Sequence, residues 1–255
     1  EFYAPGPSIT LPYTTTGAGA GEIANFRSVG DAVLRQDLAN DTDPIKGAYL
    51  VGYKGRTLYD RAGEKVSVKD FGALGNNVAD DTVAIQACFD YCTEFGGTAY
   101  FPQGTYVISS TVTLFEDIGA QEPLGGDTKA CIRGEGSGLS VLRWTGGNTP
   151  ALRIHGEVIS LQSVKGIGLT GNGTGIGLSL RDLSWFHCED VLATGFEYGV
   201  YGHNVLSSKF DTLVSRGNKF GFRLERLGGV YASHPSAISM INCDMGLNTE
   251  WGAYI

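Results

Sequence analysis

Two carboxylates 22 residues apart, Glu189 and Asp211, are the side chains whose spacing best suits catalysis. If one coil of the fold takes 22 residues, they stack on adjacent coils at about 4.8 Å, the spacing between paired strands. Carboxyl groups about 5 Å apart suit a retaining glycosidase. Like charges so close should also raise the pKa of one of them, as a general acid requires. The alternative interpretation is that both are solvated residues at strand bends.

The other reactive side chains form no familiar constellation. His155, His187, His203 and His234 are isolated in the sequence, so we expect them at the surface or at coil edges and predict no metal site. The glycine cluster at 171–175 precedes neither a helix nor a lysine, so turns explain it better than phosphate binding. The five cysteines form no C-x-x-C pair. We therefore expect no disulfide framework and no cofactor.

Aromatic residues and an acidic loop are further candidates for binding. Aromatic faces can bury the apolar sides of pyranose rings, although core packing is expected to explain at least half of this set: Tyr198, Tyr201, Phe220, Phe222 and Trp251. The loop between 116 and 127 holds four carboxylates. A solvated loop that projects from the fold is its simplest interpretation.

An internal repeat positions these groups. Three columns recur at intervals of 22: Gly173, Gly195 and Gly217; Gly177, Gly199 and Gly221; Leu169, Val191 and Leu213. This period suits one coil of a parallel β-helix made of three short strands with turns between them. A fourth copy near Trp251 is out of register by nine residues, most of which we assign to an insertion at 227–235.

The stretch before the repeat, Val66–Ile108, predicts a strand, a helix and further strands. Asp80 and Asp81 should cap the helix, and Gly96-Gly97 should end it. One apolar stripe follows from the spacing of Ile85, Cys88, Phe89 and Cys92. Because the first coil of a stack exposes unpaired backbone groups and an apolar bore, we expect this helix to seal it.

Several parts of this stretch match, in order, the opening motif of a known family. They are Val68-Lys69-Asp70-Phe71-Gly72-Ala73, Asp80-Asp81-Thr82 with Ala84-Ile85-Gln86, Gly96-Gly97, and Phe101-Pro102-x-Gly104-x-Tyr106. The chain thus resembles the right-handed parallel β-helix proteins of the pectate-lyase-like superfamily, above all bacteriophage tailspikes and capsule depolymerases. The motif is architectural, and members of the family use different active sites, so it specifies fold rather than catalysis.

The resemblance implies a homotrimeric tailspike of the virion tail, folded in the host cytoplasm. Such a spike recognises and depolymerises a bacterial surface polysaccharide: capsule, exopolysaccharide or O-antigen. Its N-terminal segment would attach it to the phage tail, the baseplate or another tailspike. This portion would then be mainly attachment and β-helix entry, and the catalytic groove would lie further along the shaft or between subunits. Two other interpretations stay open: a free-standing microbial polysaccharide lyase or hydrolase, and a glycan-binding adhesin without activity.

The fold class that follows is all-β: a right-handed parallel β-helix of about 22 residues per coil, capped by an α-helix. Residues 1–21 are interpreted as an extended arm or linker, and 22–64 as a small attachment or neck segment. Residues 65–255 are interpreted as the capping helix and the first coils, and we expect the shaft to continue further.

Within the small N-terminal segment, the pattern predicts one helix and two strands. Ser28 is the expected cap of a helix that runs to Leu38. Strands are expected over Ala48–Tyr53 and Gly55–Tyr59.

Composition excludes two classes of partner. The formal net charge is −8 and the pI about 5.0, and the few basic residues are scattered, which argues against nucleic acid. No run of eighteen apolar residues occurs, so membrane insertion is not expected. The 38 glycines and the low charged fraction, 18%, favour a turn-rich β protein.

Overall fold

The computed structural model describes residues 3–5, 26–28, 31–40, 42–43, 45–114, 130–156, 162–226 and 235–255. The acidic loop at 116–127, most of the arm and all but the last residue of the expected insertion lie outside the described residues. The chain divides into two compact units, Glu1–Glu64 and Lys65–Ile255.

The first unit consists of short elements. They are β1 (Tyr3–Pro5) antiparallel to β2 (Phe26–Ser28), α2 (Asp31–Leu38), the 3-10 helix η1 (Gly47–Leu50), β3 (Gly52–Tyr53) antiparallel to β4 (Arg56–Thr57), and α3 (Leu58–Ala62). The two expected strands are wrong over most of their length. The first begins as η1, and the second ends as α3 because Thr57 and Asp60 form a capping box. Ser28 lies in β2, so the expectation that it caps α2 is also wrong.

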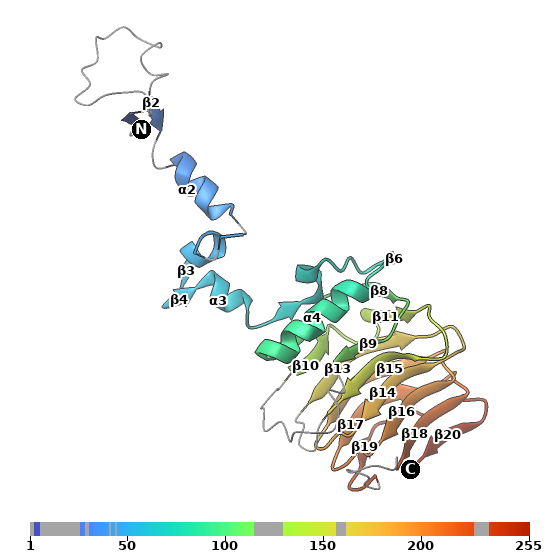
Figure 1. Ribbon diagram of the computed structural model, residues 1–255. Helices are drawn as coiled ribbons and strands as arrows, with labels where there is room; N and C mark the ends of the chain where they lie inside the picture. Colours follow the sequence, from blue (N-terminus) through green and yellow to red (C-terminus); the bar gives the residue numbers. More distant parts are fainter. Residues whose placement is uncertain are drawn as a thin grey trace, which may run out of the picture. The chain divides into compact units, whose positions relative to one another are not determined.

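The second unit is a stack of coils built from two parallel sheets (Figure 1). The ten-stranded sheet holds β5 (Val66–Ser67), β6 (Asn76–Asp80), β7 (Gly97–Phe101), β8 (Gly104–Ile108), β10 (Ala130–Gly134), β11 (Ser140–Trp144), β13 (Ser163–Thr170), β15 (His187–Thr194), β17 (Lys209–Ser215) and β19 (Ser239–Ile241). The six-stranded sheet holds β9 (Val112–Leu114), β12 (Pro150–His155), β14 (Ile176–Arg181), β16 (Tyr198–His203), β18 (Phe220–Glu225) and β20 (Trp251–Tyr254). The predicted parallel β-helix is confirmed.

The strand register confirms the repeat. His187 pairs with Lys209, and Tyr198 with Phe220, each at an offset of 22. Lys209 then pairs with Ser239, an offset of 30, and Phe220 with Trp251, an offset of 31. Eight of the nine surplus residues therefore precede Ser239, on the side where the insertion was expected.

The first two coils have the expected three short strands, β7 to β9 and β10 to β12, whereas the later coils differ. The long strands of the ten-stranded sheet bend at a left-handed residue, and these residues stack in a column: Gly166, Asp190, Thr212 and Asn242, with φ of 67°, 50°, 53° and 53°. The bent strand forms two faces of the coil and the six-stranded sheet forms the third. Thr212 is the unfavourable member, because a β-branched residue rarely adopts this conformation.

The capping helix α4 (Thr82–Phe95) covers one end of the stack and contacts η2 (Val68–Phe71), β7 and β9 (Figure 1). Its predicted stripe is fully buried: Ile85, Cys88, Phe89 and Cys92. Asp80 accepts a hydrogen bond from the Thr82 backbone as expected. Asp81 does not cap the helix with its side chain; its buried carboxylate accepts the backbone N–H groups of Leu74 and Gly75 instead, at 2.6 and 3.1 Å. This corrects its expected role and explains how the preceding loop is held against the cap.

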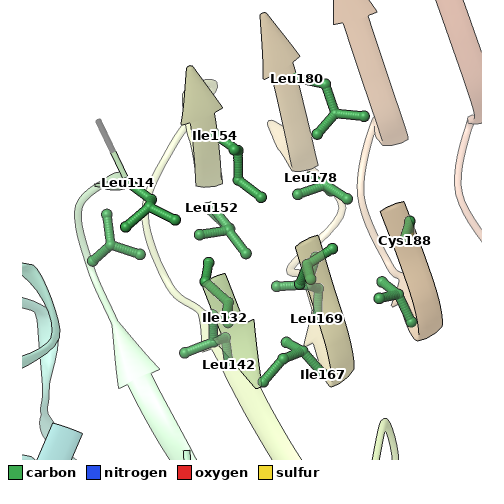
Figure 2. Packing of buried hydrophobic residues seen from close by; sticks show 14 of the residues in the cluster. Leu114, Ile132, Leu142, Leu152, Ile154, Ile167, Leu169, Leu178, Leu180 and Cys188 are labelled. Carbon is green, nitrogen blue, oxygen red and sulfur yellow. The ribbon is translucent and has the colours of Figure 1, made fainter. Parts of the chain in front are cut away.

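The bore of the stack is a continuous apolar core. Figure 2 shows its side chains stacked coil upon coil, among them Leu152, Leu178, Ile167 and Leu169. The recurring glycine column packs beside this core. A Cβ at Gly199 would lie 1.9 Å from the Ser215 hydroxyl oxygen, so a larger residue cannot fit.

Candidate functional site

Glu189 and Asp211 lie where the repeat predicts. They are register partners on β15 and β17, and each directly precedes the left-handed bend of its strand. Neither is buried. The structure therefore brings the pair onto adjacent coils of one outer face.

The electrostatics of this pair differ from the expectation. Glu189 pairs with the Lys165 ammonium, which holds the pKa of the Glu189 carboxyl below its usual range. Asp211 accepts hydrogen bonds from Lys209 and Thr212, both at 3.0 Å, and its pKa is lowered as well. The expected raised pKa is wrong for both residues, because each carboxylate has a cation nearer than the other carboxylate. Both are ionised, and neither is prepared as a general acid.

The outer face of the six-stranded sheet carries a column of aromatic rings. Tyr198, Phe220 and Trp251 are register partners on β16, β18 and β20. The centroids of Tyr198 and Phe220 are 4.7 Å apart with an interplanar angle of 26°, and those of Phe220 and Trp251 are 5.1 Å apart. Successive coils therefore place one ring above another on a surface that solvent can reach.

A second column runs beside the first. Tyr201, Arg223 and Tyr254 are register partners on the same three strands. The Arg223 guanidinium lies between the two rings, 5.7 Å from the centroid of Tyr201 and 5.5 Å from that of Tyr254. Such cation–π contacts hold the guanidinium in place against the surface.

A polar cluster of Tyr201, His203, Arg223 and Glu225 adjoins these columns. The Tyr201 hydroxyl donates to the Glu225 carboxylate, and the Arg223 Nε donates to the same carboxylate at 2.9 Å. The His203 Nε2 lies 3.1 Å from both the Tyr201 hydroxyl and Glu225 Oε1. The side chains of His203 and Glu225 are 21% and 26% exposed, so a ligand can reach them although they are partly shielded from water.

The two acids in this cluster are shifted in opposite directions. Burial and the adjacent Glu225 carboxylate raise the pKa of Tyr201 to about 12. Burial alone would raise the pKa of Glu225 too, but hydrogen bonds from Tyr201, His203 and Arg223 outweigh it and hold that pKa below its usual range. At neutral pH the cluster thus combines a protonated phenol, an ionised carboxylate and an imidazole that can accept or donate a proton. These three groups are of the kinds that carry out general acid–base catalysis.

Sequence reasoning missed this cluster, although the signal for it was present. Tyr201 and Arg223 are 22 residues apart, as are His203 and Glu225. The histidines are expected at the surface or at coil edges. His203 does lie at the end of β16, whereas His155 is only 8% exposed, with its Nε2 3.3 Å from the Asp182 carboxylate. Of the five predicted aromatic residues only Phe222 lies in the core.

Comparison with known proteins agrees with this architecture. Residues 65–127 match the family model described as rhamnogalacturonase A/epimerase, pectate lyase-like. Mannuronan C5-epimerase AlgE1 of Azotobacter vinelandii is 37% identical over 131 residues, which are 48% of this chain and 9% of that protein. The second unit has a parallel β-helix fold, and residues 65–127 are similar to the pectate-lyase-like family.

Solved β-helix structures include phage proteins. ORF18 of Geobacillus virus E2 superposes with a TM-score of 0.62 at 20% identity, over 75% of this chain and 41% of that one. The Dettilon tailspike protein superposes with a TM-score of 0.58 at 14% identity, over 84% and 43%. The predicted likeness to tailspikes is therefore confirmed for the fold. The chain spans about a tenth or less of the length of the first curated relatives that it matches.

Two further properties concern the part of this β-helix protein that the structure describes. No group of three or more His, Cys, Asp or Glu side chains in it is arranged to hold a metal ion. None of its helices is long and apolar enough to cross a membrane.

Proposed function

We propose that the chain is part of a phage tailspike whose β-helix recognises and depolymerises a bacterial surface polysaccharide. The outer face of β14, β16, β18 and β20 is the surface that binds the glycan in this proposal. The observation that carries it is the pair of stacked columns headed by Tyr198 and Tyr201, with the Glu225 cluster beside them.

The geometry of the columns favours a polymer over a single sugar. Rings on consecutive coils repeat at about 4.8 Å along the shaft, so they offer several stacking positions in a row. Tyr and Trp combine an apolar face with a polar edge, which suits the two kinds of surface on a pyranose ring. The Arg223 guanidinium adds positive charge next to any acidic sugar in the chain.

The cluster supplies the groups that glycan cleavage needs. A bond to a sugar oxygen breaks more easily when one group donates a proton to the leaving oxygen and another accepts one. Tyr201 stays protonated at neutral pH and so can donate its proton, although its raised pKa makes it a weaker acid than an ordinary tyrosine, and His203 and Glu225 lie within hydrogen-bond reach of its hydroxyl. We assign acid–base roles to these three residues.

Glu189 and Asp211 are the competing candidates for catalysis. They stay a prediction, and a direct comparison decides between the two faces. Glu225→Gln should lower the cleavage rate about 100-fold if the cluster is catalytic. Glu189→Gln and Asp211→Asn should then leave the rate within about twofold of the wild type.

A second candidate function is the modification of a uronate polymer without cleavage. The curated relatives named mannuronan C5-epimerases favour it, since inversion at a sugar carbon needs a group that removes a proton and one that returns it. The same cluster could serve, because Tyr201 and His203 share one hydrogen-bond network with Glu225. Epimerisation would change the sugar composition while the chain length stays constant.

We assign virion attachment to residues 22–64 and a homotrimeric state to the complete spike. The partner of that segment is the phage tail, its baseplate or another tailspike, which places the protein in the virion tail. The tailspike fold of the second unit supports this assignment. Light scattering and chemical crosslinking of the full-length protein should report a trimer. A monomer with the same activity would favour the free-standing enzyme.

The decisive experiment incubates the purified full-length protein with a panel of capsular polysaccharides, exopolysaccharides, O-antigens and alginate. Falling chain length indicates depolymerisation, and products that absorb as unsaturated uronides separate a lyase from a hydrolase. Binding without any change in the polymer indicates an adhesin.

Matched variants test the surface. Tyr198→Ala should weaken polymer binding about tenfold, because one stacked aromatic ring is lost. Tyr91→Ala is its control, since Tyr91 is an exposed ring on α4, 4.8 Å from that of Phe95. Glu197→Gln is the control for Glu225→Gln, because Glu197 precedes β16 and pairs with Lys219 outside the cluster. If the controls lower binding and rate as much as the test variants do, the assignment of this face is wrong.

A further inference from the structure

The outer face of the ten-stranded sheet contains a hollow of about 240 Å³ near the capped end of the stack. It lies over β7, β10 and β13, on a different sheet from the aromatic columns. Three cationic side chains line it: Lys65, Arg133 and Lys165. The hollow is therefore separate from the site described above.

Three cations and two carboxylates line this hollow, and one of the cations, Lys165, pairs with Glu189. Its two carboxylates have partners: Asp190 accepts from the Ser137 backbone and hydroxyl at 3.2 and 2.7 Å, and Glu135 accepts from the Tyr100 hydroxyl. Arg133, by contrast, has no side-chain hydrogen bond or ion pair within the described part of the chain. A guanidinium that faces a hollow without a partner is a ready site for an anion.

The shape of the hollow follows from the coil register. Tyr100, Arg133 and Lys165 are successive members of one column across β7, β10 and β13, and Lys65 lies over the Tyr100 ring with its Nζ 5.2 Å from the centroid. The floor is made of glycines, because a Cβ at Gly166 would lie 2.9 Å from a neighbouring carbonyl oxygen. The lining thus combines an aromatic ring, three cations, two carboxylates and three glycines.

We propose that this hollow is a second glycan subsite that binds a negatively charged sugar residue. The proposal rests on the proposed function, since it assumes that the shaft meets a polysaccharide. Arg133 would bind the carboxylate or sulfate of the sugar with two parallel hydrogen bonds, and Lys65 would add charge. The Tyr100 ring would border the sugar. Asp190 and Glu135 also line the hollow, and their carboxylates accept hydrogen bonds from Ser137 and Tyr100.

Two subsites on different sheets of one shaft have a consequence for chain length. A long polymer can occupy both, or several spikes can crosslink it, so binding at the second subsite raises the effective concentration at the first. A short oligosaccharide occupies one subsite at a time. Loss of the hollow should therefore weaken the retention of long anionic polymers more than the turnover of short substrates.

The test uses full-length protein and three probes measured by calorimetry: oligomannuronate, dextran sulfate and neutral dextran. Arg133→Gln is the main variant, because Arg133 has no partner whose loss would disturb the fold. Lys69→Gln is the matched control, as an exposed cation on η2 that does not line the hollow. We expect Arg133→Gln to weaken the binding of the anionic probes about tenfold, and Lys69→Gln to leave it within about twofold. Neutral dextran should show no difference.

The probes distinguish a uronate from a sulfate ligand by which of them loses affinity in the variant. Equal binding of both anionic probes to wild type and Arg133→Gln overturns the proposal. Equal weakening by Arg133→Gln and Lys69→Gln also overturns it, since the attraction would then belong to the surface charge as a whole. A wild type that binds an anionic probe through Arg133, yet neither cleaves nor retains any polysaccharide, would sustain the hollow and refute the proposed function.

Discussion

The two outer faces of the β-helix share one strand register but carry different kinds of side chains. On the six-stranded sheet, register partners are aromatic, and they hold Arg223 and Glu225 within a shared network. On the ten-stranded sheet the partners are charged, running from Arg133 through Lys165 and Glu189 to Asp211. The first face keeps a phenol protonated beside a carboxylate, whereas the second pairs both Glu189 and Asp211 with a lysine.

This difference separates proximity from reactivity. Stacking on adjacent coils brings any two side chains of a column together, so closeness alone says little about chemistry. Glu225 and Glu189 differ in their neighbours. Glu225 contacts a partly buried tyrosine and histidine, whereas Glu189 contacts a single exposed lysine. The repeat determines where the titratable side chains lie, and the side chains of the neighbouring columns determine their protonation states.

The largest effect is expected inside the stack, where the two sheets should behave alike. Phe210 and Phe222 come from different sheets and their ring centroids are 5.0 Å apart in the core. Replacing either with Ala should lower the free energy of unfolding by about 3–5 kcal/mol, because each leaves a cavity. Chemical denaturation measures this. Tyr198→Ala on the outer face is the control and should cost about 1 kcal/mol; an equal loss would contradict the division into core and surface.

The next prediction concerns the stability of the folded protein at alkaline pH, where Tyr201 ionises. Tyr201 has a folded-state pKa of about 12 against 10.0 for the ordinary group. Because the folded protein holds this proton more tightly, its stabilisation is complete below pH 10 and is lost as pH rises toward 12. Tyr201→Phe should remove this decline, which amounts to about 2 kcal/mol at most after allowance for partial exposure. Thermal unfolding of both proteins between pH 9 and 12 is the measurement. Parallel curves would contradict the raised pKa.

A gain of stability is expected at the bend beside Asp211. Thr212 adopts φ of 53°, and the equivalent residue one coil on is Asn242 at the same φ. Thr212→Asn should raise the free energy of unfolding by about 1 kcal/mol, because Asn tolerates the left-handed conformation better than a β-branched residue. Thr113→Asn is a matched control in an ordinary strand of the same protein and should not stabilise it. Denaturation midpoints decide the point.

The smallest effect tests the charged face. Lys165→Gln should change the free energy of unfolding by less than about 0.5 kcal/mol, since exposed ion pairs contribute little. The pKa of Glu189 should rise back toward its usual value, because the cation that lowers it is gone. Titration of the Glu189 carboxyl by nuclear magnetic resonance would measure this. An unchanged pKa would mean that another group sets it.

Most of the fold could be predicted from the sequence, because a 22-residue period and a capped helix are local patterns that packing does not alter. Which residues of each strand face the core and which face solvent could not be predicted. In β16 both Gly199 and Val200 are buried, so the simple alternation of inner and outer residues fails. The absence of a Cβ at Gly199 lets the Ser215 side chain pack closely against it, and only the fold as a whole fixes that contact.

The candidate site was predictable in position and less so in chemistry. The 22-residue repeat that pairs Glu189 with Asp211 also pairs His203 with Glu225. It does not show which side chains lie in the neighbouring column. The protonation of Tyr201 and Glu225 depends on the network between columns, whose bonded members are two, 22 and 24 residues apart. The expected cap at Asp81 failed for a similar reason, since a loop six or seven residues upstream competes for its carboxylate.

Because the spacing between paired strands is constant, each coil adds one fixed step to the distance along the stack. Any two side chains of one column are separated by a whole number of steps of about 4.8 Å, so Tyr198 and Trp251, two coils apart, stand at a distance that no loop can adjust. Removing residues 187–208, one full period, would rejoin matching strands and subtract a single step. The distance between two side chains of one column is therefore set by the number of coils between them, and it changes only in discrete increments.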